Sequence, residues 1–173
     1  MFTAVRIRSR ALEVIAAAVM LLSPAFPAHA QRAAEPGSPF AGLAGSWSGS
    51  GTITLASGAT ERIRCRATYA VSSAGTDLQQ TLRCASDSYN FDLRSTVAYE
   101  EGRIRGTWAE TTRNASGTVS GQASRGVVQA SVVGRDFSAG LLVSTRGDRQ
   151  AVTINSQGAA LAQASISLAR TPR

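Results

Sequence analysis

Apolar and polar residues alternate along most of the chain, in short stretches separated by turn signals about every ten residues. The pattern predicts strands at 47–55, 61–71, 77–85, 89–99, 103–112, 117–123, 127–133, 137–145, 150–154 and 161–169. No helical segment separates them, which argues against alternating βαβ units and favours an antiparallel barrel or sandwich. We expect an all-β fold, an antiparallel up-and-down β-barrel of about 8–10 strands.

The second and third predicted strands form a hairpin whose register can be worked out. If its turn centres on Ala74 and Gly75, Cys65 lies directly opposite Cys84. Directly opposed Cβ atoms lie about 4.5–5.5 Å apart, within reach of a disulfide after local adjustment. The sequence therefore predicts a Cys65–Cys84 disulfide, with two free buried thiols as the alternative.

The two faces of this hairpin differ in polarity. One face is apolar and is predicted to face the core, whereas the other carries Arg62, Arg64, Arg66 and Arg83. A slip of one residue would turn the arginines inward, so the register is strongly specified, although it sets Arg66 against Arg83. The four arginines form either a solvated strand face or a candidate anion-docking surface.

The first 30 residues have the order of a secretory signal. Arginines precede an apolar run at 11–22, and small residues follow it up to Ala30, after which we expect cleavage. The run is shorter than the roughly 20 residues of a membrane span, so an uncleaved anchor is only the alternative. We expect a periplasmic or secreted protein that is not an integral membrane protein.

The chain beyond the signal is predicted to hold one domain. Residues 31–39, rich in Pro, Ala and Gly, are expected to form a flexible N-terminal arm, and residues 40–173 a single β-barrel domain.

The amino-acid composition excludes several kinds of catalytic site. All 18 basic residues are arginine, the formal net charge is +7, and the only histidine is His29, inside the predicted signal. Without histidine or lysine the domain has no Ser-His-Asp triad, no Ser-Lys dyad, no Schiff base and little zinc chemistry. We expect a protein that is not an enzyme, with no cofactor and no metal. The positive charge favours an anionic partner, with an ordinary soluble surface as the alternative. The candidate partners are an anionic envelope surface or a protein, and no nucleic acid partner is expected.

The alternation in the later strands predicts which side chains face the barrel interior. Trp108 and Glu110 share one face of their strand, and Phe137 and Leu141 share an apolar face of theirs. With Tyr69 from the hairpin, they are the candidate ligand-binding residues. An inward Glu110 needs an arginine or a ligand donor beside it; otherwise it lies in water at the barrel mouth.

The start of the domain resembles the lipocalins and their calycin relatives. Phe40 and Leu43 precede Gly45 and Trp47, which match the family's apolar turn followed by Gly-x-Trp. The resemblance implies an up-and-down barrel whose base is closed by Trp47, with Arg170 near the end of the last strand packed over the indole. Both residues are then structural, and a small apolar ligand is implied.

A second resemblance is to small barrels that Gram-negative bacteria export as metalloprotease inhibitors. These also begin with Ala-Gly-x-Trp after a flexible arm and carry one disulfide in their first half, as residues 44–47 and the two cysteines do here. We therefore expect a non-catalytic protein that binds a small apolar or amphipathic ligand in or at the mouth of its barrel. The alternative is a protein-binding envelope module, either a protease inhibitor or an anionic-surface docking protein.

Overall fold

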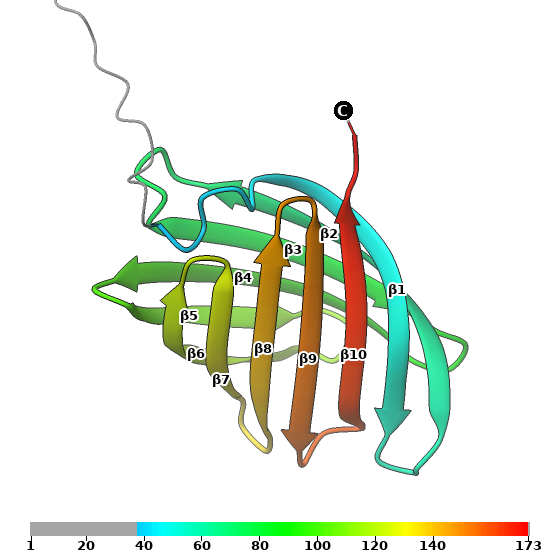
Figure 1. The fold of residues 1–173 in the computed structure, drawn as a ribbon. Coiled ribbons are helices and arrows are strands. Elements are labelled where there is room, and N and C mark those ends of the chain that lie inside the picture. The colour runs from blue at the N-terminus through cyan, green and yellow to red at the C-terminus, as the bar shows by residue number, and fades with distance from the viewer. Residues whose placement is uncertain (1–37, 173) are drawn as a thin grey trace, which may run out of the picture. The chain divides into compact units, whose positions relative to one another are not determined.

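The computed structural model describes residues 38–172, which form ten antiparallel strands (Figure 1). Their bounds are β1 Gly45–Leu55, β2 Thr60–Val71, β3 Asp77–Ala85, β4 Asn90–Glu100, β5 Arg103–Glu110, β6 Ala115–Ser124, β7 Val127–Val133, β8 Ser138–Arg146, β9 Arg149–Gln157 and β10 Leu161–Arg170. Each strand pairs with the next along the chain, and β1 pairs with β10, so the sheet closes into an up-and-down barrel. The prediction of an all-β up-and-down barrel is confirmed, and the sandwich is excluded.

The barrel has two ends that differ in how they are closed. The end of the barrel where β1 begins and β10 ends is called the base, and the opposite end is called the rim. The base carries the turns at 72–76, 101–102, 125–126 and 147–148, and the rim those at 56–59, 86–89, 111–114, 134–137 and 158–160. In the part of the chain that the structure describes, no helix is long and apolar enough to cross a membrane.

The predicted register of the β2–β3 hairpin is confirmed. Cys65 lies opposite Cys84 and Arg66 opposite Arg83, because the turn at 72–76 centres where the sequence places it. The two cysteine Cα atoms are 4.2 Å apart and the sulfur atoms 2.09 Å, a bonded distance. A disulfide is consistent with an oxidising compartment.

The base is plugged by an apolar turn that precedes β1. Phe40, Leu43 and Trp47 are buried, and the indole N–H of Trp47 donates to the Leu43 carbonyl at 2.8 Å. Arg170, directly opposite Trp47 in the β1–β10 pair, lies with its guanidinium carbon 4.4 Å from the indole centroid. This is the arrangement that the lipocalin resemblance implies.

The guanidinium of Arg170 also ties the plug to the barrel. Its N–H groups donate to the carbonyls of Ala44, at 2.5 Å, and of Gly42. Its Nε donates to the Asp148 carboxylate at 2.7 Å. One side chain therefore joins the turn before β1, the first strand and the β8–β9 turn.

Glycines on the inner face let neighbouring strands approach closely. A Cβ added at Gly49 on β1 would lie 1.9 Å from the carbonyl oxygen of Ser167 on β10, and one at Gly117 on β6 would lie 1.8 Å from that of Val133 on β7. No side chain fits there, so these positions require glycine.

Candidate ligand-binding cavity

The barrel encloses a cavity of about 440 Å³. It reaches from Phe40 and Leu43 at the base to the rim, where Tyr89, Arg113 and the turn at 158–160 line it. The wall between is mainly apolar and includes Leu78, Leu82, Leu93, Val97, Ile104 and Val119. The plug closes the basal end of the cavity, and the other end lies at the rim.

Aromatic side chains form one side of the cavity. Trp108 on β5 is buried, and its ring centroid lies 5.3 Å from that of Phe137, in the turn before β8. The indole N–H donates to the Val133 carbonyl at 3.3 Å, which fixes the ring orientation. Leu141 of β8 lines the same cavity. The group offers a flat apolar surface to a bound molecule.

A polar row crosses the wall from β2 to β5. Tyr69 lies opposite Gln80, Gln80 opposite Ser95, and Ser95 opposite Trp108. The Ser95 hydroxyl donates to Gln80 Oε1 at 3.1 Å. Among the hydrogen bonds of residues 38–172, none uses Nε2 of Gln80, a residue that lines the cavity.

The Tyr69 hydroxyl, at one end of this row, has a hydrogen-bond partner within the protein. The hydroxyl donates to Gln150 Oε1 at 2.8 Å, and Gln150 Nε2 donates to the Thr145 hydroxyl at 3.1 Å. Burial raises the pKa of Tyr69 to about 12, although the bond to Gln150 opposes the shift. Tyr69 is therefore a neutral part of the wall at any physiological pH.

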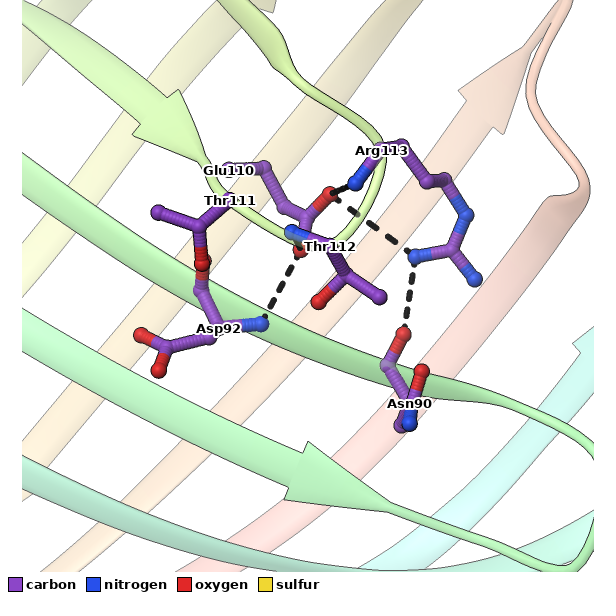
Figure 2. A network of polar contacts seen from close by, with 6 residues as sticks. All are labelled: Asn90, Asp92, Glu110, Thr111, Thr112 and Arg113. Atoms are coloured by element: carbon purple, nitrogen blue, oxygen red, sulfur yellow. Dashed lines mark hydrogen bonds and ion pairs between the residues drawn. The ribbon is translucent and has the colours of Figure 1, made fainter.

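Glu110 ends β5 at the rim and is held by the turn that follows (Figure 2). Its Oε1 accepts the backbone N–H groups of Asp92 at 3.0 Å and Thr112 at 2.8 Å, and its Oε2 accepts that of Arg113 at 2.8 Å. Burial raises the pKa of the carboxyl, but hydrogen bonds from Thr112, Asp92 and Arg113 outweigh it and hold the pKa below its usual value. Glu110 is thus an ionised anchor for the β5–β6 turn.

Arg113 lies beside this carboxylate but is held by other groups (Figure 2). Its guanidinium carbon is 4.3 Å from the Tyr89 ring centroid, and Nη1 donates to the Asn90 carbonyl at 2.8 Å. The distance from Nη1 to Glu110 Oε2 is 3.8 Å, a looser contact than the three backbone bonds. Arg113 therefore places a guanidinium at the rim, next to the ionised Glu110.

The structure places all five candidate ligand-binding residues, Tyr69, Trp108, Glu110, Phe137 and Leu141, in the cavity wall. Whether they bind a ligand stays a prediction. Sequence reasoning missed Gln80, Ser95, Tyr89 and Arg113. Strand alternation could have placed Gln80 inward, since it lies between Leu78 and Leu82 on the same face of β3, and could likewise have placed Ser95 on β4. Arg113 lies in a turn, where alternation gives no direction.

The four arginines of the candidate anion-docking surface lie outside the barrel. Arg62, Arg64, Arg66 and Arg83 are all exposed. Arg83 is paired with Asp92 at 2.7 Å, a partner on β4 that the hairpin alone could not reveal. The predicted signal and arm residues up to 37 lie outside the described residues.

Fold and cavity together define a small antiparallel barrel of the calycin-like kind. No protein-family model and no curated protein sequence matches the chain. Several solved structures share the fold, including the following two. Rv2717c from M. tuberculosis is 12% identical with a TM-score of 0.61, covering 78% of this chain and 94% of its own. The S-type phycobiliprotein lyase CPES from Guillardia theta is 13% identical with a TM-score of 0.51, covering 78% and 91%.

The lyase corrects one prediction. We expected a protein that is not an enzyme, from the missing histidine and lysine and from the lipocalin resemblance. A barrel of the same fold is a lyase by name, which contradicts this expectation. A Ser-His-Asp triad, a Ser-Lys dyad and a Schiff base remain excluded for the predicted domain, because it has no histidine or lysine. The fold itself, however, does not restrict the chain to non-catalytic binding.

Proposed function

We propose that the barrel binds a small apolar or amphipathic molecule in its interior. The observation that carries the proposal is the cavity of about 440 Å³, lined mainly by apolar side chains and closed at the base by the plug. Small-molecule sites are mostly apolar hollows of about 300–1,000 Å³ with a few placed polar groups. A lyase with the same fold is consistent with an interior that holds a small molecule.

The polar groups of the cavity favour an amphipathic molecule over a pure hydrocarbon. Gln80 lines the cavity at mid-depth, where its Oε1 accepts from Ser95 and its Nε2 can donate to a bound molecule. Arg113 offers a guanidinium at the rim. The apolar part of the molecule then lies against Trp108 and Phe137, an acceptor oxygen faces Gln80, and an anionic or polar end faces Arg113.

We also propose that the protein acts after export. The arginine, apolar and small-residue order of the first 30 residues and the cysteine pair both support an oxidising, extracytoplasmic compartment.

Two adjacent leucines give a matched test of the cavity. Leu141 lines the cavity, whereas Leu142 points outward and is 47% exposed. We expect the wild type to bind 1-anilinonaphthalene-8-sulfonate, an apolar ring system with an anionic group, with a fluorescence increase. The variant Leu141→Trp should lose about tenfold or more in affinity because the indole fills the space, whereas Leu142→Trp should bind as the wild type does.

Equal binding by both variants, with urea midpoints close to that of the wild type, would show that the dye binds elsewhere. That result would reject the proposal that the cavity is the binding site. Native mass spectrometry of the protein purified from its own host then identifies the bound molecule by its mass.

A further inference from the structure

Charge is unevenly distributed over the outside of the barrel. Strands β2 to β5 carry six exposed arginines, Arg62, Arg64, Arg66, Arg83, Arg94 and Arg105, besides Arg103 at the base. Within residues 38–172, strands β1, β6 and β7 carry no charged residue, and β8, β9 and β10 carry charges only at their basal ends. Strands β2 to β5 also carry acidic residues, namely Glu61, Asp77, Asp92, Glu100 and Glu110. Among the ten described strands, the exposed arginines that lie away from the strand ends are therefore confined to β2 to β5, and the question is which of them have no acidic partner.

Strand β2 contains a straight row of three arginines. Arg62, Arg64 and Arg66 alternate along β2, so their Cα atoms are spaced by about 6.5–7 Å on one face. Directly opposite on β1 lie Thr52, Ser50 and Ser48. Each guanidinium thus has a hydroxyl residue as its cross-strand neighbour, and we call the two rows together the β1–β2 ridge.

The charge of this ridge is not neutralised by the protein. The ion pairs formed by residues 38–172 involve Arg83, Arg113 and Arg170, and none involves an arginine of the ridge. Glu61, next to Arg62 in sequence, instead accepts the backbone N–H of Ser88 at 3.0 Å. Arg66 also faces Arg83 across the β2–β3 pair, an arrangement that repels. The ion pair of Arg83 with Asp92 offsets part of this repulsion, and an external anion at Arg66 would offset the rest.

We propose that the β1–β2 ridge binds a linear polysaccharide that carries carboxylate groups, with the chain lying along β2. Guanidinium groups bind carboxylates in a bidentate manner, and the serine and threonine hydroxyls can bond to sugar hydroxyls. Arg62, Arg64 and Arg66 follow one another along a single strand, as the carboxylates of a linear polymer follow one another along its chain. Among residues 38–172, the large exposed apolar side chains, Val127, Val133 and Leu142, lie on β7 and β8. In this part of the chain the ridge therefore has no large apolar side chain beside it that could insert into lipid.

The test uses alginate, a linear polymer of uronic acids, with neutral dextran as the comparison. We expect the wild type to bind alginate and not dextran, with affinity falling steeply between about 50 mM and about 500 mM salt. The variant Arg62→Gln/Arg64→Gln/Arg66→Gln should lose about tenfold or more in affinity, since each exposed pair contributes a few-fold.

A second triple variant serves as the control, because it removes three arginines that lie outside the ridge. Arg125, Arg135 and Arg146 are exposed and lie in turns or at a strand end, so Arg125→Gln/Arg135→Gln/Arg146→Gln should retain most of the binding. Equal losses in the two variants would show that net charge alone attracts the polymer and would overturn the proposal. So would ridge-dependent binding to phosphatidylglycerol vesicles without binding to alginate. Urea midpoints confirm that both variants are folded.

Discussion

At the scale of single residues, the buried and half-buried charges of this barrel hold turns and ends in place. Glu110 collects three backbone N–H groups around the β5–β6 turn, and Arg170 binds two backbone carbonyls of the plug. Each satisfies main-chain groups that the strands leave unpaired. Both residues are therefore expected to affect stability more than their ion pairs alone would.

The variant Glu110→Gln is expected to lower the free energy of unfolding at pH 7 by about 1–3 kcal/mol, because three hydrogen bonds lose their charged acceptor. The pKa of Glu110 is lower in the folded protein than its usual 4.5, so its stabilisation is present above that pH and is lost as the pH falls through the folded pKa. Urea unfolding at pH 7 and at about pH 3 should therefore show a deficit that shrinks in acid. A deficit that is unchanged in acid would contradict this account. The exposed Glu100→Gln serves as the control.

The variant Arg170→Leu is expected to cost about 1–3 kcal/mol, since it removes the contact with Trp47 and leaves two carbonyls of the plug without donors. Breaking only the ion pair with Asp148→Asn should cost less than about 0.5 kcal/mol, because the Asp148 side chain is 77% exposed. Thermal unfolding of the two variants compares them directly. Similar losses in both would mean that the ion pair, and not the plug contacts, is what stabilises the base.

At the scale of the elements, close strand approach and one covalent link fix the sheet. The inner-face glycines admit neighbouring carbonyl oxygens where any side chain would collide. The cysteine pair joins β2 to β3 in the register that the turn between them sets. These are features of particular strand pairs, so their effects can be tested pair by pair.

The variant Gly49→Ala should be destabilised by about 2 kcal/mol or more, because β1 and β10 must separate to admit the methyl group. Gly140 on β8 is the matched control. A Cβ there would meet nothing closer than the Asn155 carbonyl oxygen at 4.0 Å. Gly140→Ala should be neutral or stabilising by up to about 1 kcal/mol. Urea midpoints in the opposite order would refute the close-approach argument.

Each of Cys65→Ser and Cys84→Ser should cost about 2–4 kcal/mol, and the double variant should cost no more than either. The cross-link closes a loop between residues separated by 19 positions, and one substitution already opens it. Chemical denaturation of all three variants gives the comparison. An additive loss in the double variant would mean that the two side chains contribute through packing and not through a bond.

At the scale of the whole molecule, the strands and the hairpin register were predictable and the cavity was not. Alternation and turns located all ten strands, with shifts of a few residues at their ends, and the register follows because a slip would bury arginines. The hollow interior depends on how inward side chains from ten strands fill the space, which no local pattern encodes. The partners of Arg83 and Glu110 likewise came from strand pairing and turn geometry.

The pairing of β1 with β10 has a kinetic consequence. Every other neighbouring pair in the barrel joins consecutive strands, whereas this one brings Trp47 to Arg170 from opposite ends of the domain. Closing so long a loop carries the largest entropy cost, so we expect this seam to form last. Weakening it should speed unfolding and leave the folding rate nearly unchanged. An open seam would expose two unpaired strand edges and the apolar cavity wall, and both favour aggregation.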